Sequence, residues 1–182
     1  PKDDDQYVII DVSEPEFLDP IVKRESVVEV IDHHSGYEDY WQDKIGSGAH
    51  IEFIGAAATL VYERWVEAGQ QKHINPDTAK ALCAGILDNT LNFKASVTTM
   101  RDKAAFDALS CIGGIDDMWV HNYFMDCQRS ALNNLEETII GDTKRISKTD
   151  HLPALVSQLA VWDSDTFISG LLDEVASTLS TL

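Results

Sequence analysis

Short apolar runs rich in β-branched residues alternate with segments of helical periodicity in the first half of the chain. The runs Tyr7 to Asp11 (YVIID) and Val27 to Asp32 (VVEVID) each end in an aspartate, and Ala49 to Ile54 is a third apolar run. Apolar runs of this length are typical of buried strands in parallel sheets. We predict three such strands, and the segment Glu14 to Lys23 is long enough for a short crossover helix between the first two.

Helical periodicity follows the third strand. Gly55 to Gly69 carries apolar residues on one face and begins with small residues, which allow tight packing or close approach of an anion to the helix N-terminus. Asn75 and Pro76 suit the N-cap and first turn of a helix that reaches Leu87. Further helices are predicted at residues 100–110, 116–129, 130–140 and 165–179, with a strand-like segment at 152–161.

This order of segments predicts an α/β fold in which a parallel sheet is flanked by helices. The character of the sequence changes at Asp142 to Asp150 (DTKRISKTD), where polar residues dominate. We therefore place a domain boundary in this stretch. Residues 1–148 form the first domain, and residues 149–182 begin a second α/β domain.

Composition and charge limit the classes of partner. The chain is 44% apolar and 25% charged, as in ordinary globular proteins, and its net charge is −17. Without a basic stripe, nucleic acid is not the expected partner. A small phosphorylated ligand is compatible with this charge, because bound divalent metals reverse the local field; the alternative is that the acidity only maintains solubility.

Neither a membrane span nor a disulfide framework is predicted. No apolar run approaches the ~20 residues that a membrane-spanning helix needs. The three cysteines, Cys83, Cys111 and Cys127, form no Cys-x-x-Cys pair, and their odd number does not suit a disulfide framework. We expect a reduced, cytoplasmic protein.

Candidate chemistry lies at the ends of the predicted strands. Asp11 ends the first strand, Asp32, His33 and His34 end the second, and Asp88 follows an apolar helix. In open α/β sheets, ligands bind outside the carboxyl ends of the strands. Mixed imidazole and carboxylate ligands suit Mn²⁺, Co²⁺, Fe²⁺ and Zn²⁺. The residues alone leave two interpretations open: a metal site, or acidic caps at element ends beside exposed histidines.

Four spaced blocks carry a resemblance to a known family. They are VEVIDHH at residues 28–34, IGAAATLV at 54–61, AGILDNTLNFK at 84–94, and LEE with DTK at 135–144. In this order they resemble the DHH phosphoesterase superfamily, most closely the manganese-dependent (family II) inorganic pyrophosphatases and the exopolyphosphatases. The resemblance covers about residues 7–146, with weaker similarity to the start of a C-terminal DHHA2-type domain.

The resemblance implies a metal site with two divalent ions, Mn²⁺ or alternatively Co²⁺ or Mg²⁺. Asp11 matches the acid that bridges the two metals. His33 and Asp88 match terminal ligands of one metal. The ions would activate a water and neutralise phosphate oxygens during in-line attack.

The resemblance also implies residues that act on the substrate. His34 matches the active-site histidine that faces substrate, and Asp32 matches an acid that orients the ligands. Lys144 matches a lysine that binds substrate phosphate. From the residues alone, a lysine in a polar hinge is more often solvated than functional.

Three departures from the family pattern change the expectation. The first family motif, His-x-x-x-Asp-x-Asp, has no counterpart here and is expected upstream of Pro1; the C-terminal Ser-Arg-Lys motif is also missing. We therefore expect about half of the family's site in this chain, which by itself can be inactive. The second motif reads DVSE at residues 11–14, where pyrophosphatases have His and Asn after the Asp. This favours an exopolyphosphatase-like relative.

Three functions are carried forward. The first is metal-dependent hydrolysis of phosphoanhydride bonds in pyrophosphate or short polyphosphate. The second is a phosphodiesterase acting on short oligonucleotides or cyclic dinucleotides, although the glycine-rich motif of those branches is not seen. The third is a noncatalytic regulatory module with an incomplete metal site. Homodimer formation is left open.

Overall fold

The computed structural model describes residues 2, 4–145, 155–159 and 161–181. The chain divides into two compact units, Pro1–Ile115 and Asp116–Leu182. The predicted domain boundary after residue 148 falls within residues 146–154, outside the described residues, and stays a prediction.

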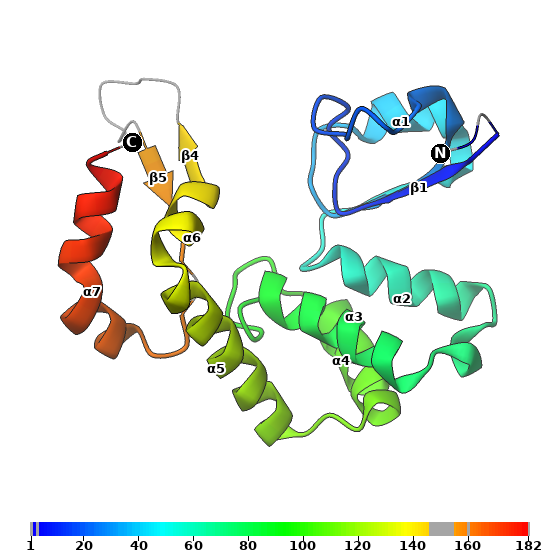
Figure 1. Ribbon diagram of the computed structural model, residues 1–182. Helices are drawn as coiled ribbons and strands as arrows, with labels where there is room; N and C mark the ends of the chain where they lie inside the picture. The colour runs from blue at the N-terminus through cyan, green and yellow to red at the C-terminus, as the bar shows by residue number, and fades with distance from the viewer. Residues whose placement is uncertain (1, 3, 146–154, 160, 182) are drawn as a thin grey trace. The chain divides into compact units, whose positions relative to one another are not determined.

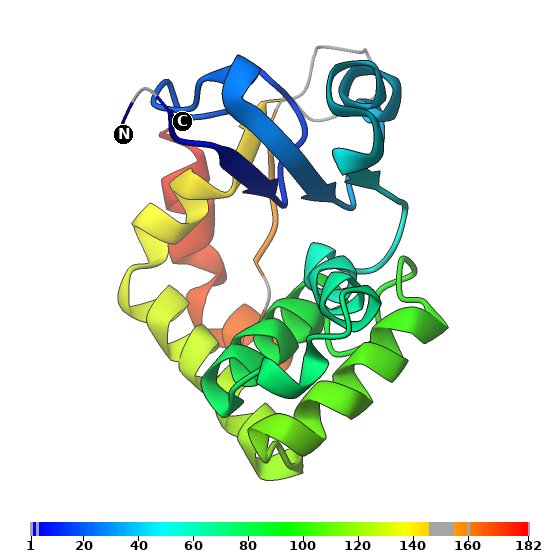
Figure 2. The same cartoon turned by 90° about the vertical axis from the view of Figure 1, so that its right-hand side faces the viewer.

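A parallel three-stranded sheet organises the first unit, as the sequence predicts. Its order is β1 (Tyr7–Ile10), β2 (Val27–Asp32) and β3 (Ala49–Ile51), so β2 lies in the centre (Figure 2). Ile10 is in register with Ile31, and Asp32 with Ile51. The carboxyl ends of β1 and β2 therefore lie side by side. The α/β class is confirmed, and the third strand ends at Ile51 rather than at residue 54.

The carboxyl half of the central strand, Val30 to Asp32, is buried on both faces. On one face Val30 packs with Ile9 and with the fully buried Trp41 of α1 (Glu38–Ile45), whose Nε1–H donates to the Ser13 carbonyl at 2.6 Å. On the other face Ile31 packs against α2 (Ala57–Glu67). Figure 1 shows α1 beside the strands. The sequence pattern did not predict α1, because this short helix buries only Trp41.

The connection between β1 and β2 contains no α-helix among residues 14–23, contrary to the prediction. Instead it forms turns, followed by a short 3₁₀ helix, Arg24–Ser26. Pro15 and Pro20 explain the difference, because a proline disfavours the α conformation in the residue before it. The Tyr7 hydroxyl donates to the Ile21 carbonyl at 3.0 Å and so ties the turns to β1.

Three helices form the rest of the first unit, α2, α3 (Pro76–Asn89) and α4 (Met100–Gly113), which pack together in Figure 1. The predicted N-cap at Asn75 is confirmed, since its side chain accepts from the Thr78 amide at 2.8 Å. Two 3₁₀ helices, Gly46–Gly48 and Gln71–His73, precede β3 and α3. The core between α2, α3 and α4 is made of small and medium residues: Ala56, Ile74, Ala79, Cys83, Ile86, Ala105 and Leu109.

The second unit contains three helices and a short hairpin among its described residues. The elements are α5 (Asp117–Asn133), α6 (Leu135–Gly141), the antiparallel pair β4 (Thr143–Arg145) and β5 (Leu155–Ser157), and α7 (Ser164–Leu179). The break between α5 and α6 falls at Asn134 rather than after residue 129. Buried Gln128 joins α5 to the start of α7 by accepting from the amides of Trp162 and Asp163 at 2.8 and 3.0 Å.

No helix in the described part of the chain is long and apolar enough to cross a membrane.

A left-handed turn follows α3. Leu91, Asn92 and Phe93 all have positive φ, between 48° and 62°, a conformation that costs a non-glycine residue roughly 1–2 kcal/mol. Buried Thr90 holds the turn. Its hydroxyl donates to the Ile86 carbonyl at 2.6 Å and accepts from the Phe93 amide at 3.2 Å.

Replacing Thr90 by Val should lower the free energy of unfolding by about 1–3 kcal/mol, because the Phe93 amide loses its hydrogen-bond acceptor and the Ile86 carbonyl keeps only the bond from the Thr90 amide. Urea denaturation measures this. Thr98→Val is the matched control. The Thr98 hydroxyl is buried and has no hydrogen-bond partner among the described residues, so that variant should stay within about 0.5 kcal/mol of wild type. Equal losses in both variants would contradict the role of Thr90.

The thiols should differ in reactivity. Burial raises the pKa of Cys83 to about 12, so this residue stays protonated near pH 8, and its side chain is fully buried. Cys111 is exposed. A thiol reagent added to the native chain should modify Cys111 quickly and Cys83 only after denaturation. Mass spectrometry of the labelled peptides, with Cys111→Ser as control, measures this, and fast native labelling of Cys83 would contradict its place in the core.

Candidate metal centre

Three of the predicted site residues meet at the carboxyl edge of the sheet. Asp11 follows β1, and His33 and His34 follow β2. One ligand atom from each of the three lies within 4.8 Å of the others. The parallel register of β1 and β2 produces this meeting, since each strand delivers its last residues to the same edge.

Hydrogen bonding orients the His33 ring. Its Nδ1 lies 3.1 Å from the Ile54 carbonyl oxygen. A carbonyl only accepts, so Nδ1 carries a proton and donates. In neutral His33 this leaves the Nε2 lone pair free. That Nε2 is buried, lies 3.2 Å from Asp11 Oδ1 and forms no well-oriented hydrogen bond in the described part of the chain.

The surroundings of the His33 ring favour its positively charged, protonated form. The Asp11 carboxylate raises the pKa of His33, burial opposes the shift, and the Ile54 carbonyl adds to the rise. Asp11 itself is half exposed and sits in the left-handed region with φ of 67°. Its amide donates to the Ile31 carbonyl at 2.9 Å, which fixes the backbone despite the strain.

Asp32 lies behind the two histidines and is fully buried. Its Oδ1 accepts from the backbone amides of His33 and His34, at 2.7 and 3.2 Å, and from His34 Nδ1 at 2.8 Å. Burial alone would raise the pKa of Asp32. The neighbouring Ser13 side chain and the hydrogen bonds from His34 outweigh that effect and lower it. The carboxylate thus fixes the orientation of His34, whose side chain is 57% exposed.

The other two predicted site residues are not part of this cluster. Asp88 is exposed in the last turn of α3, and it is not among the described residues whose ligand atoms lie within 4.8 Å of one another. Lys144 is exposed on β4 of the second unit. Their roles as metal ligand and as phosphate-binding residue stay predictions.

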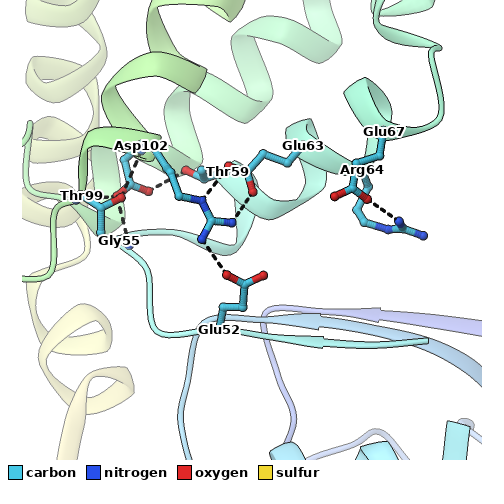
Figure 3. A network of polar contacts seen from close by, with 9 residues as sticks. Glu52, Gly55, Thr59, Glu63, Arg64, Glu67, Thr99 and Asp102 are labelled. Atoms are coloured by element: carbon cyan, nitrogen blue, oxygen red, sulfur yellow. Dashed lines mark hydrogen bonds and ion pairs between the residues drawn. The ribbon is translucent and has the colours of Figure 1, made fainter. Parts of the chain in front are cut away.

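A network that the sequence reasoning missed holds the loop between β3 and α2. Asp102, fully buried in the first turn of α4, accepts from the Gly55 amide at 3.2 Å and from the Thr59 hydroxyl at 2.6 Å (Figure 3). It also accepts from the amide and hydroxyl of Thr99, both at 2.7 Å. The signal in the sequence was the capping-box spacing of Thr99 and Asp102.

Arg101, which is partly exposed, contacts the same connection between β3 and α2 and the helix that follows it. Its guanidinium contacts Glu63 of α2 at 2.5 and 2.8 Å, and Glu52 just after β3 at 2.6 Å. Glu63, and to a lesser extent Glu52, raises the pKa of Arg101. Two neighbouring residues of α4 therefore fix the segment that carries the Ile54 carbonyl.

The residues present suit a divalent cation. A metal-binding histidine ordinarily donates its second ring nitrogen to a carbonyl or carboxylate, and His33 does so. Its other nitrogen is buried and faces a carboxylate oxygen. Imidazole with carboxylate is the donor set preferred by Mn²⁺, Co²⁺ and Zn²⁺.

No protein-family model matches the chain. Among curated proteins it is 25% identical over 152 residues to the "Probable manganese-dependent inorganic pyrophosphatase" of Staphylococcus carnosus, covering 81% of this chain and 47% of that protein. It is 27% identical over 136 residues to the protein of the same name from Deinococcus radiodurans, covering 71% of this chain and 40% of that protein. The chain thus spans about half the length, or less, of these relatives.

A solved structure shares the fold. The crystal structure of a Methanococcus jannaschii protein, named as a family II inorganic pyrophosphatase, superimposes with a TM-score of 0.64 at 20% identity. The match covers 86% of this chain and 52% of that chain. The chain therefore has an α/β fold seen in a protein of that name, and its weak similarity to manganese-dependent pyrophosphatases supports a relation to the DHH superfamily.

Proposed function

We propose that the protein carrying this chain hydrolyses phosphoanhydride bonds in pyrophosphate or short polyphosphate with the help of divalent metal. One observation carries the proposal: His33 Nδ1 donates to the Ile54 carbonyl, and the buried Nε2 faces Asp11 Oδ1 at 3.2 Å. When His33 is neutral, this arrangement presents an unprotonated imidazole nitrogen and a carboxylate oxygen to one point in space.

The relatives support pyrophosphate as the first substrate to test, because they are named as inorganic pyrophosphatases. The residues after Asp11 support short polyphosphate as the second. Val12 and Ser13 stand where His and Asn are expected in a pyrophosphatase, and Ser13 is buried against Asp32. Both substrates present the same phosphoanhydride bond to the site.

Each residue has a part in this proposal. His33 and Asp11 hold a divalent ion, Mn²⁺ in the first instance, and the family resemblance adds Asp88 and a second ion. When bound, such ions supply positive charge to phosphate oxygens and make a bound water more acidic. His34, with Nδ1 held by Asp32 at 2.8 Å, keeps its Nε2 available to accept or donate a proton near substrate.

Mn²⁺ should bind the chain through His33. Replacing His33 by Ala removes the buried nitrogen and should weaken Mn²⁺ binding at least about 10-fold, as measured by isothermal titration calorimetry. His73→Ala is the matched control, because His73 is exposed in a 3₁₀ helix outside the cluster. Equal Mn²⁺ affinity in the two variants would overturn the assignment.

Asp88 is tested in the same way. Asp88→Asn should also weaken Mn²⁺ binding about 10-fold or more, because a charged ligand is replaced by a neutral one. Asp77→Asn, which neutralises another exposed acid at the opposite end of α3, is its control. An unchanged Mn²⁺ affinity in Asp88→Asn would remove Asp88 from the site.

The reaction is tested by measuring phosphate release with Mn²⁺ from pyrophosphate and from tripolyphosphate. The protein that carries this chain should release phosphate from at least one of them, and a chelator should abolish the release. The ratio of the two rates distinguishes pyrophosphatase from polyphosphatase. Release from neither, with Mn²⁺ bound, would contradict the proposal and favour the phosphodiesterase or the noncatalytic module.

A further inference from the structure

A single peptide group connects the candidate metal ligand His33 to a buried acid on a distant helix. The Ile54 carbonyl accepts from His33 Nδ1 at 3.1 Å, and the amide of the next residue, Gly55, donates to Asp102 Oδ2 at 3.2 Å. That carbonyl and that amide belong to the same peptide group. The order is therefore carboxylate, peptide, imidazole, with each group hydrogen-bonded to the next.

We propose that Asp102 is a positioning residue that, through the Ile54–Gly55 peptide, keeps the proton of neutral His33 on Nδ1 and its Nε2 free for a divalent cation. The inference rests on the proposed function for the identity of the ligand. A carboxylate at the amide end of a peptide polarises that peptide and makes its carbonyl a stronger acceptor. The stronger acceptor favours the Nδ1–H tautomer over the Nε2–H tautomer.

The surroundings of Asp102 are built for a charged carboxylate. Its side chain is fully buried, and four donors face its two oxygens: the Gly55 amide, the Thr59 hydroxyl, and the Thr99 amide and hydroxyl. A buried carboxylate is tolerated when it is hydrogen-bonded in this way. No cation contacts it in the described residues, so its charge acts on the groups that donate to it.

A capping role alone does not explain these contacts. In a capping box the acid needs only the N-cap backbone amide, here that of Thr99. Asp102 also reaches across to Gly55, before α2, and to Thr59 within it (Figure 3). This contact requires glycine at position 55, because a Cβ there would lie 2.5 Å from Asp102 Oδ2 and 2.8 Å from Asp102 Cγ.

The test removes the charge and keeps the shape. In Asp102→Asn the amide oxygen can still accept from Gly55 and Thr99, while the NH₂ group donates to the Thr59 hydroxyl. The primary measurement is the ¹⁵N chemical shift of both His33 ring nitrogens in the metal-free chain, at alkaline pH where the imidazole is neutral. Wild type should show a protonated Nδ1 and an unprotonated Nε2. Asp102→Asn should shift the population towards the Nε2–H tautomer and weaken Mn²⁺ binding about 10-fold.

Two control variants separate positioning from stability. Thr59→Val removes a donor to Asp102 Oδ1 but keeps the charge and the Gly55 contact, so the His33 tautomer should not change. Asp116→Asn makes the same chemical change at the N-cap of α5, and it too should leave His33 unchanged. His33 ring shifts that are the same in Asp102→Asn as in wild type would overturn the proposal.

A second measurement applies if Asp102→Asn does not fold. In the wild-type chain, scalar couplings across hydrogen bonds should connect Gly55 N to Asp102 Cγ and His33 Nδ1 to Ile54 C′. The presence of both supports the connection, and the absence of either overturns it. These readouts need no metal. A wild-type chain with the predicted tautomer but no Mn²⁺ affinity would overturn the proposed function and not the role of Asp102 in placing the proton.

Discussion

The hydrogen bond from His33 Nδ1 to the Ile54 carbonyl is the constraint on which the candidate site depends. It fixes the ring orientation and decides which imidazole nitrogen is free. His33 comes from the end of β2, whereas Ile54 lies after β3, so the bond forms only if these two segments are held in register. The parallel pairing of β2 with β3 holds the start of the Ile54 segment beside the end of β2. Helix α4 also holds this segment, through Arg101 and Asp102.

Two buried carboxylates give the site its rigidity. Asp32 and Asp102 are both fully buried, and the hydrogen bonds to their oxygens come from amides, hydroxyls and, for Asp32, the His34 ring rather than from Lys or Arg. Such bonds to a charged acceptor are among the stronger ones in proteins, about 1.5–3 kcal/mol each. A chain with a net charge of −17 can thus organise an anionic site without a Lys or Arg partner for these two carboxylates among the described residues. Positive charge then enters with the metal in the proposed function.

Local patterns predicted the parts of the fold that local chemistry determines. The strands β1 and β2 and the Asn75 cap follow from apolar runs and capping residues, and Asp11, His33 and His34 meet because parallel strands end at one edge. The prediction of a crossover helix was wrong: the segment is long enough for one, but Pro15 and Pro20 disfavour the helical conformation in the residues before them. Helix α1 was missed because its stability comes from burying Trp41 against the sheet, a tertiary contact.

The support for His33 could not be predicted for a similar reason. Asp102 lies 47 residues after Gly55, and its spacing from Thr99 indicates only a helix cap. That it also reaches the loop before α2 follows from the packing of α4 on α2, which no local pattern encodes. The opposite holds for Asp88. The resemblance of residues 84–94 to a family motif predicts that Asp88 is a metal ligand, but the cluster among the described residues consists of Asp11, His33 and His34.

The most direct test of the central claim is a crystal of the chain grown with Mn²⁺ and measured with X-rays at the manganese absorption edge. The account predicts an anomalous-scattering peak beside His33 Nε2 and Asp11 Oδ1, with His33 Nδ1 still directed at the Ile54 carbonyl. A manganese peak elsewhere with none at His33, or a His33 ring turned so that Nδ1 no longer faces Ile54, would contradict it.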